Sequence, residues 1–329
     1  MWLFANGETP QAPLDTAFEW SNGQLHSYQL DSSNPALQAG SDTPIVVDAT
    51  GTAWIGLNRT VVSVDPISGS IDTFTLPDVS VADSGSGLPV PPPGTPAELF
   101  TDIDAMALGA NGDVIIGRMY ATELQVLDLS TGGISAIPLP DPTELSGTGA
   151  GDLTGNGSEV AAALYAGQGE HELGQYVDES WVVSDSDCDA SAVSMGSGLL
   201  AVTGDGCVAV GALAEGQPAT VSSQPVSSNV PITASSDGPC AMAVSPTEVA
   251  YCSQDALGIG PVGESSDVSV ALGQIAEGPP SIPGGATSGG VIGNTLTPIT
   301  PGLLAASGSG ALWFVPAEGG TDVGVVEHG

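Results

Sequence analysis

The sequence has no lysine and only two arginines, Arg59 and Arg118, against 38 aspartates and glutamates, which gives a formal net charge of -36. Proteins bind a phosphate backbone through lysine and arginine side chains that displace counterions. Because such side chains are almost missing, the composition excludes nucleic acid and anionic membrane surfaces as partners. Charged residues make up 12% of the chain, about half the usual share, so the chain is poor in bases rather than unusually rich in acids.

Surplus carboxylates repel one another less where salt shortens the screening length below about 10 Å. The acidic composition therefore favours a secreted or cell-surface protein of an organism from a saline habitat. A second interpretation is a protein that binds cations, with Ca²⁺ or Mg²⁺ as the candidate cofactor, or one that binds a basic partner.

The sequence also lacks a run of about 20 apolar residues, which a membrane-spanning helix needs, so we expect no membrane insertion. The chain opens at Met1 with MWLFANG, which has neither the basic region nor the apolar stretch of a secretory signal peptide. Either a leader has been removed or the protein is cytosolic. The abrupt ends at Met1 and Gly329 also permit a role as one part of a larger extracellular assembly.

Only four cysteines occur, Cys188, Cys207, Cys240 and Cys252, and none lies in a CxxC pair. Four cysteines allow three pairings, and joining nearest neighbours would link Cys188 to Cys207 and Cys240 to Cys252. The segment CAMAVSPTEVAYC is typical of two strands around a Ser-Pro turn, which would bring its end cysteines together. We therefore predict structural disulfides rather than zinc, which favours a location outside the cytosol.

Glycine and proline are abundant, with 46 and 26 residues, and they exclude long helices in favour of many short strands joined by turns. Residues 51–77 alternate apolar and polar positions around a Pro-Ile-Ser-Gly turn, and residues 109–140 repeat this phrase. Weaker copies of the phrase follow along the chain. The matched residues are Gly51 with Gly112, Gly56 with Gly117, Asp65 with Asp128, Gly69 with Gly132 and Pro77 with Pro140.

The repeat supplies one anchor position per copy, equivalent to Trp54, and its spacing fits one four-stranded antiparallel sheet per repeat. Such sheets cannot bury both faces alone, so we predict an all-β fold, a single β-propeller domain over residues 1–329. Seven blades are expected, or six if the two termini share one blade. The anchors are Trp2, Trp54, Ile115, Val160, Ala201, Ala250 and Trp313; the blades are 1–40, 45–77, 102–140, 148–184, 188–226, 238–275 and 295–329, with long loops at 78–98 and 276–294.

The phrase Gly-x-x-Trp-x-x, followed by Val-x-x-Val-Asp-x-x-(Ser/Thr)-Gly-x-Ile-x-x-Phe-x-Leu-Pro, resembles the repeat of the streptogramin lyase (virginiamycin B lyase-like) β-propellers and their NHL and YVTN relatives. The resemblance covers residues 45–77 and 102–140, and more weakly 301–329. It implies a β-propeller. It also implies, as one alternative, a C-O lyase in which histidine acts as acid and base while glutamate and magnesium steer the ester region of the substrate.

The chain has three histidines, His26, His171 and His328. His26 falls in the outermost repeated strand, and His328 is the penultimate residue, so neither fits a buried base. His171 is flanked by Glu170 and Glu172, which makes these three the candidate catalytic residues, because a neighbouring carboxylate favours the charged form of histidine. A solvated histidine is the competing interpretation.

Two acidic runs resemble calcium loops, in which oxygen ligands recur at alternate positions. One run offers Asp185, Asp187 and Asp189. The other offers Asp152, Thr154, Asn156 and Glu159, and residues 152–166 also resemble the FG-GAP repeat of integrin-type propellers. Aspartate and asparagine also have an ordinary structural role in turns, which is the competing interpretation of both runs.

From these observations we expect a secreted or cell-surface module that binds a protein or carbohydrate ligand, or serves a structural role, without catalysis of its own. The alternatives are a lyase-like or carbohydrate-acting enzyme with a central metal, and a subunit of an extracellular assembly. Trp54 and Trp313 are expected to pack between sheets, while Trp20, Tyr120, Tyr176 and Trp181 are candidates for a ligand face. Arg59 should have a buried carboxylate partner.

Overall fold

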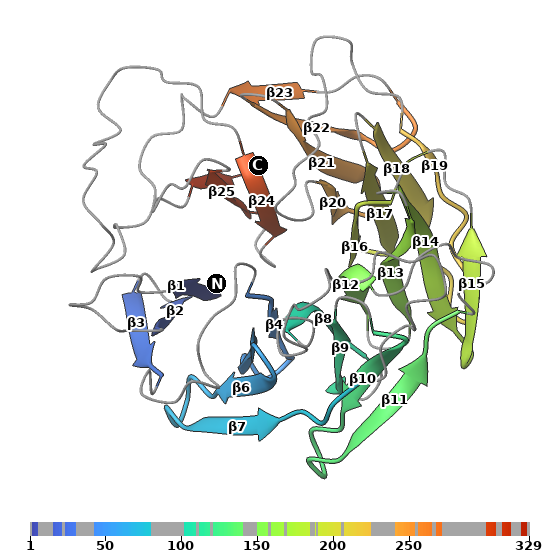
Figure 1. Ribbon diagram of the computed structural model, residues 1–329. Helices are drawn as coiled ribbons and strands as arrows, with labels where there is room; N and C mark the ends of the chain where they lie inside the picture. Colours follow the sequence, from blue (N-terminus) through green and yellow to red (C-terminus); the bar gives the residue numbers. More distant parts are fainter. Residues whose placement is uncertain are drawn as a thin grey trace. The chain divides into compact units, whose positions relative to one another are not determined.

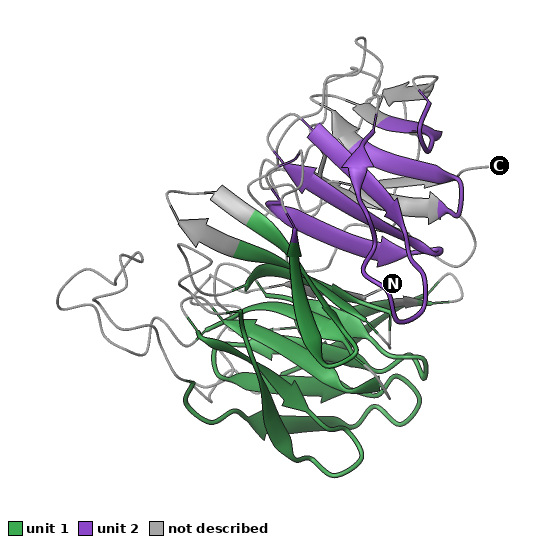
Figure 2. Ribbon diagram, turned by 90° about the vertical axis from the view of Figure 1, so that its right-hand side faces the viewer, with its two compact units in different colours: residues 1–183 green, residues 184–329 purple. Residues whose placement is uncertain are grey.

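In the computed structural model, all regular elements among the described residues are β-strands, and the chain divides into two units, residues 1–183 and residues 184–329 (Figure 2). No helix in the described part of the chain has the length and apolar character that crossing a membrane requires. The structure describes residues 2–5, 16–21, 24–30, 43–79, 102–109, 112–118, 121–140, 150–156, 159–167, 170–184, 188, 190–204, 207–224, 241–253, 256–264, 268–271, 301–306, 311–316 and 324–327.

The described residues of unit 1 form four antiparallel sheets, and in each sheet the strands that follow one another in sequence are neighbours (Figure 1). The first sheet has three strands among the described residues, β1 (Trp2–Ala5), β2 (Thr16–Ser21) and β3 (Gln24–Gln29). The other three sheets have four strands each: β4 (Ile45–Val47), β5 (Ala53–Leu57), β6 (Thr60–Val64) and β7 (Ile71–Thr75); β8 (Ile103–Leu108), β9 (Val114–Arg118), β10 (Glu123–Leu127) and β11 (Ile134–Pro138); and β12 (Ala150–Gly155), β13 (Val160–Gly167), β14 (Glu170–Val177) and β15 (Ser180–Ser184).

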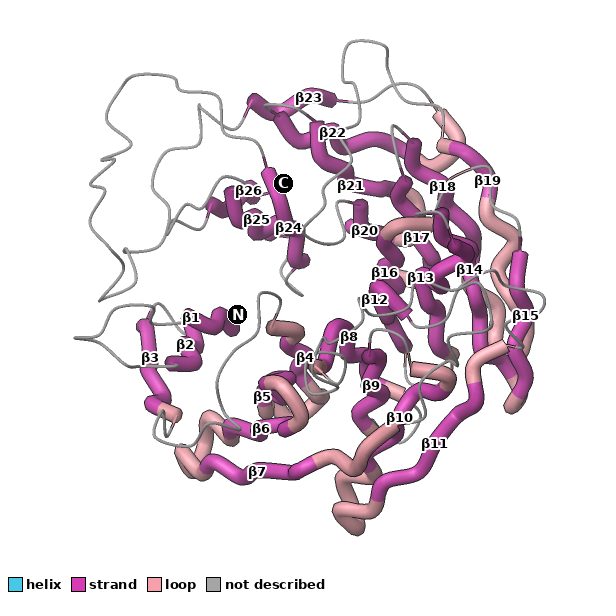
Figure 3. The backbone as a smooth tube through the Cα atoms, in the orientation of Figure 1, coloured by secondary structure: helices cyan, strands magenta, loops and turns pink. Residues whose placement is uncertain are grey.

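Unit 2 continues the same pattern with three antiparallel sheets in the described residues (Figure 3). Two of them have four strands: β16 (Ala192–Gly196), β17 (Leu199–Gly204), β18 (Cys207–Ala212) and β19 (Ser222–Ser223); and β20 (Ala241–Ser245), β21 (Glu248–Ser253), β22 (Ala256–Pro261) and β23 (Val268–Ala271). The third has β24 (Pro301–Ala306), β25 (Ala311–Pro316) and β26 (Gly324–Glu327).

The burial of each strand follows its place in the sheet. All five residues of β5 and all five of β6 are buried, whereas four of the five residues of the outer strand β7 are exposed. A central strand that is covered on both faces carries apolar residues on both faces, and β5 and β6 do so with sequences AWIGL and TVVSV. The polar alternation of the repeated phrase therefore belongs to its outer strand.

Within each unit, neighbouring sheets of the described residues pack face to face and bury apolar clusters between them. In unit 1, β2 packs against β5 and β6 through Ala17 and Ile55, and β5 packs against β8 and β9 through Trp54 and Met106. The next interface joins β9 to β12 and β13, and in unit 2 a cluster joins β17 and β18 to β21. These interfaces explain why a single sheet would not be stable alone.

The predicted repeat is confirmed by the backbone of its turns. Gly51 and Gly112 have φ angles of 89° and 82°, and Gly69 and Gly132 have 70° and 71°. Each matched pair thus adopts the same left-handed conformation, which glycine tolerates best. The anchors from Trp54 to Trp313 all lie on the second strand of their sheets, in the β5, β9, β13, β17, β21 and β25 positions.

The prediction of an all-β fold built from four-stranded antiparallel sheets is confirmed. The number of blades, the closure of the ring and the predicted blade boundaries stay predictions. The loop predicted at 276–294 and most of the loop predicted at 78–98 lie outside the described residues.

The repeated turns give a prediction for acid stability. Asp128 Oδ1 accepts hydrogen bonds from the backbone nitrogen and hydroxyl of Ser130 at 2.8 and 2.6 Å, and Oδ2 accepts one from the Thr131 hydroxyl at 2.6 Å. These bonds, the Ser130 hydroxyl first, lower the pKa of Asp128 from 3.8 to about 2. Because the folded pKa lies below the unfolded one, Asp128 stabilises the fold above pH 4, and this contribution is lost as the pH falls from 4 to 2.

Asp128→Ala is therefore expected to lower the urea midpoint at pH 6 and to unfold like the wild type near pH 2. Urea titrations between pH 2 and pH 6 check this result, with Asp72→Ala on the exposed strand β7 as the control. An equal loss at pH 2 and pH 6 would contradict the assignment.

Candidate functional site

The two basic residues of the chain lie near each other at one edge of two neighbouring sheets. Arg59 belongs to the two-residue turn between β5 and β6, and Arg118 is the last residue of β9. The Asn58 carbonyl accepts a hydrogen bond from the backbone nitrogen of Ile103 at 2.9 Å, and Ile103 pairs with Arg118 in the β8–β9 ladder. The backbone therefore fixes the turn that carries Arg59 against the strand end that carries Arg118.

Arg118 is buried to an unusual degree for a charged side chain, with 1% of its surface exposed. Its Nε, Nη1 and Nη2 atoms have no hydrogen-bond partner among the described residues. A guanidinium offers five N–H donors, and each buried donor without an acceptor costs about 1–3 kcal/mol. Burial, and next the charge of Arg59, lower the pKa of Arg118 to about 10, so Arg118 is still a cation at neutral pH.

Three aspartates surround the two arginines. Arg59 Nη2 donates to Asp78 Oδ1 in a salt bridge between side chains that are 38% and 82% exposed. Asp102 and Asp104 act on Arg118 through their charge and raise its pKa in part, as Asp78 does. Burial raises the pKa of Asp102, and the charge of Arg118 opposes that shift. We call these five residues the arginine cluster.

The expected carboxylate partner of Arg59 is present, but the expectation that it is buried is wrong, because Asp78 lies at the surface. Arg118 was not among the predicted site residues, although the repeat carries a signal for it. Gly56 matches Gly117, so Arg118 occupies the position of Leu57, which is 0% exposed on β5. The alignment alone therefore places an arginine where the preceding repeat has a buried leucine.

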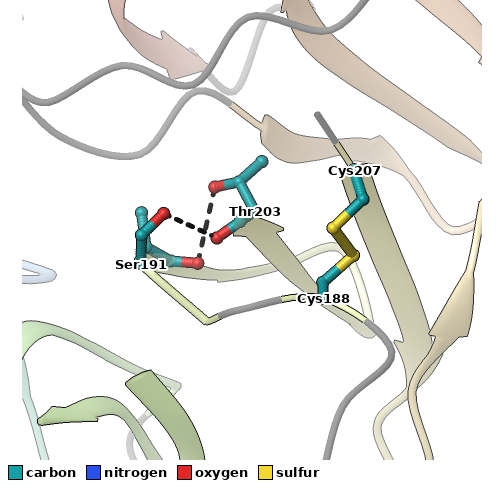
Figure 4. Close-up of a disulfide and its surroundings, with 5 residues drawn as sticks. Cys188, Ser191, Thr203 and Cys207 are labelled. Carbon is teal, nitrogen blue, oxygen red and sulfur yellow. Dashed lines mark hydrogen bonds between the residues drawn. A yellow bond between two sulfur atoms is a disulfide. The ribbon is translucent and has the colours of Figure 1, made fainter. Parts of the chain in front are cut away.

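Of the three pairings that the sequence allows, the structure forms the nearest-neighbour disulfide Cys188–Cys207 in unit 2, with the two Cα atoms 5.8 Å apart (Figure 4). Cys207 begins β18, and Cys188, which is 1% exposed, lies just before β16. Close to it, the Ser191 hydroxyl donates to the Thr203 carbonyl at 3.0 Å, and the Thr203 hydroxyl donates to the Ala192 carbonyl at 3.4 Å. Cys240 and the side chain of Cys252 lie outside the described residues.

The residues proposed as a calcium loop in β12 and its turn do not all come together. Asp152 and Thr154 lie in β12, paired with Ala163 and Ala161. Asn156 follows the end of β12 at Gly155 and is four residues from Asp152, about 13 Å at the usual rise of an extended chain. An extended strand cannot curl its ligands around one ion as a loop does.

The structure does bring Asn156 and Glu159 together at the turn between β12 and β13. Asn156 Oδ1 accepts a hydrogen bond from the backbone nitrogen of Glu159 at 3.0 Å, and Asn156 Nδ2 donates to Glu159 Oε2 at 3.4 Å. Glu159 is 3% exposed, and its Oε1 has no hydrogen-bond partner among the described residues. A buried carboxylate oxygen beside an amide is a donor set that suits a hard cation.

The other candidate residues fall at the limits of the described structure. Asp185, Asp187, Asp189 and His328 lie outside it. Glu170, His171 and Glu172 lie on β14, where His171 pairs with Tyr165, but the side chains of Glu170 and His171 are not described. His26 is exposed on β3, as expected for an outermost strand. Among the described residues, no three His, Cys, Asp or Glu side chains gather as a metal cluster.

Two of the aromatic residues expected at a ligand face pack on the core instead. The Tyr176 and Trp181 rings have centroids 5.3 Å apart, and both rest on the cluster between β9, β12 and β13. Trp181 Nε1 donates to the Pro138 carbonyl at 2.8 Å, which ties β15 to β11. The prediction for Trp54 is confirmed, since it is 7% exposed between β5 and β8. Tyr120 and the side chains of Trp20 and Trp313 lie outside the described residues.

Four-stranded antiparallel sheets that pack face to face in sequence order are the blades of a β-propeller, and known structures support this class. Two of the similar structures are of virginiamycin B lyase from Staphylococcus aureus. A catalytically inactive histidine-to-alanine variant with quinupristin aligns with a TM-score of 0.59 and 13% identity over 95% of this chain and 87% of the lyase. A selenomethionine-substituted form aligns with a TM-score of 0.52 and 14% identity over 83% and 77%.

Regucalcin from Agrobacterium tumefaciens, a calcium-binding protein, aligns with a TM-score of 0.49 and 12% identity over 89% of this chain and 90% of that one. No protein-family model and no curated protein sequence matches the chain. At these identities the two lyase structures establish the β-propeller fold and leave the activity open.

Proposed function

We propose that this chain is a β-propeller that works outside the cytosol, secreted or at the cell surface, as a non-catalytic binding or structural module in a saline medium. The Cys188–Cys207 disulfide carries this proposal. Structural disulfides persist in oxidising compartments and are rare in the reducing cytosol of most organisms. The charge of -36 supports the saline setting, because salt screens the repulsion of exposed carboxylates.

Cell fractionation of the source organism, followed by peptide mapping without reductant, tests the proposal. We expect the protein in the medium or in the cell-envelope fraction, with the peptides that contain Cys188 and Cys207 linked. Detection in the cytosolic fraction alone, with both thiols free to react with an alkylating agent, would overturn it.

The resemblance to streptogramin lyases supplies the rival proposal of an enzyme. Incubation of the purified protein with quinupristin and Mg²⁺, followed by mass spectrometry, separates the two. The binding module leaves the antibiotic intact, whereas a lyase opens its ring.

A divalent cation that stabilises the fold belongs to the same proposal, and Asn156 and Glu159 are the residues that would hold it. Addition of Ca²⁺ is expected to raise the melting temperature of the wild-type protein and to leave that of Glu159→Gln unchanged, because the amide removes the anionic ligand. Thermal unfolding in Na⁺ at constant ionic strength checks this result, with Asp152→Asn as the matched control. An equal Ca²⁺ response in Glu159→Gln would place the cation elsewhere.

A further inference from the structure

We propose that Arg118 and Arg59 form a receptor for one carboxylate group, carried by a small organic acid or by the C-terminus of a peptide. This inference rests on the proposed binding role and names the chemical class of the ligand.

Charge is the first argument for this site. With Arg59 and Arg118 as the two basic side chains in a chain of 329 residues, an anionic ligand has one place where it can meet a pair of guanidinium groups. A planar guanidinium matches a carboxylate with two parallel hydrogen bonds. Arg118 keeps Nε, Nη1 and Nη2 without partners among the described residues, and Arg59 keeps Nε, so donors from both arginines are left to receive the two oxygens of one carboxylate.

The position of Arg118 is the second argument. The matched residue of the preceding repeat, Leu57, is 0% exposed. An apolar side chain therefore packs well at this position of the blade. An arginine with no hydrogen-bond acceptor in the same place lowers stability, and residues that break a local rule of folding in this way concentrate at functional sites.

Asp78 is the third argument, because its carboxylate already occupies part of the site. It pairs with Arg59 although it is 82% exposed, and an exposed ion pair contributes little to stability. An incoming carboxylate can therefore replace Asp78 on Arg59 at small cost. Because Arg118 is 1% exposed, the groups covering Arg118 must move aside when the ligand binds. Asp102 and Asp104 favour the charged form of Arg118 without accepting any of its hydrogen bonds.

The alternative is an internal ion cluster in which Arg118 neutralises the charge of Asp102 and Asp104. The thermal stability of an Arg118 variant distinguishes this cluster from a ligand receptor. Replacing a buried charge by an apolar residue is neutral or stabilising when no internal partner depends on it, and strongly destabilising when it leaves buried carboxylates behind. Arg118→Leu, which restores the residue of the matched repeat, is expected to melt at the same temperature as the wild type or higher when no carboxylate is present.

Thermal unfolding with N-acetylglycylglycine, its C-terminal amide, or sodium acetate tests binding at constant ionic strength. At about 100 times its dissociation constant, the acid is expected to raise the melting temperature of the wild type by about 4 °C. The amide should have no effect, and Arg118→Leu should lose the acid response. A response to acetate equal to that of the peptide acid assigns the site to small acids, and a larger peptide response assigns it to chain termini.

Two further variants keep the test decisive if Arg118→Leu does not fold. The difference between acid and amide should shrink in Arg59→Gln and grow in Asp78→Asn, because the second variant removes the competing carboxylate. No difference between acid and amide in the wild type, or a marked destabilisation of Arg118→Leu with an unchanged acid response, overturns the proposal. A cytosolic location would overturn the proposed extracellular role and leave this acid response in place.

Discussion

Replacement of Trp54 by alanine is expected to lower the free energy of unfolding by about 3–5 kcal/mol, the usual cost of removing a large buried aromatic side chain. Trp54 is 7% exposed at the interface between two sheets of unit 1. Its ring lies 5.8 Å from that of Phe74, and its Nε1 donates to Asp48 Oδ2 at 3.0 Å. The substitution removes contacts of both sheets at once.

Urea unfolding followed by far-ultraviolet circular dichroism measures this loss without depending on tryptophan fluorescence. Trp54→Phe is the matched control: it keeps an aromatic ring in the interface and loses the bond to Asp48, so it should cost clearly less than the alanine variant. A loss below about 1 kcal/mol for Trp54→Ala is typical of a surface site and would show that Trp54 does not support the interface.

The repeat made most of the fold predictable, because its strongest signals are local. A glycine such as Gly51 or Gly69 is needed where φ is positive, whatever the rest of the chain does. An aspartate followed by Ser or Thr, such as Asp128, closes its turn through its own neighbours. These features depend on a few consecutive residues, and they recur at matched positions in both strong copies of the phrase.

The candidate sites were less predictable, because spacing along the sequence does not decide whether a segment is a loop or a strand. Alternating oxygen ligands at 152, 154 and 156 fit a calcium loop and fit one face of a strand equally well. The pairing of β12 with β13 places Asp152 and Thr154 in a strand, and Asn156 follows in the turn. Only Asn156 and Glu159, on the two sides of the turn, then remain close enough to share one ion.

The arginine cluster depends on pairing between residues far apart in the sequence. Asn58 accepts the backbone hydrogen bond of Ile103 only once the sheets that contain β5 and β8 have packed together. Ile103 in turn pairs with Arg118 in the β8–β9 ladder. The composition shows that the chain has two arginines as its basic residues. It does not show that the two arginines lie close together. The match between Arg118 and Leu57 was the one local signal in the sequence. It predicts that the Arg118 side chain is buried, but it does not predict that Arg59 lies nearby.

Removal of the Cys188–Cys207 disulfide is expected to cost about 3 kcal/mol, because the bond closes a loop with a sequence separation of 19 residues in the unfolded chain. It joins the start of β18 to the segment before β16, and both lie in unit 2. The same loss is expected whether the bond is reduced or both cysteines are replaced by serine.

The double variant Cys188→Ser with Cys207→Ser measures this effect in urea unfolding, and Cys240→Ser with Cys252→Ser is its matched control. If Cys188 and Cys207 form a structural bond, dithiothreitol should lower the midpoint of the wild type and of the control, since both keep this bond. The double variant Cys188→Ser with Cys207→Ser should have the lower urea midpoint already without dithiothreitol. Because it lacks the Cys188–Cys207 bond, reduction of that bond cannot lower its midpoint further. A midpoint in that variant equal to the wild-type value would mean that the bond does not stabilise unit 2. Only peptide mapping would then support an oxidising compartment.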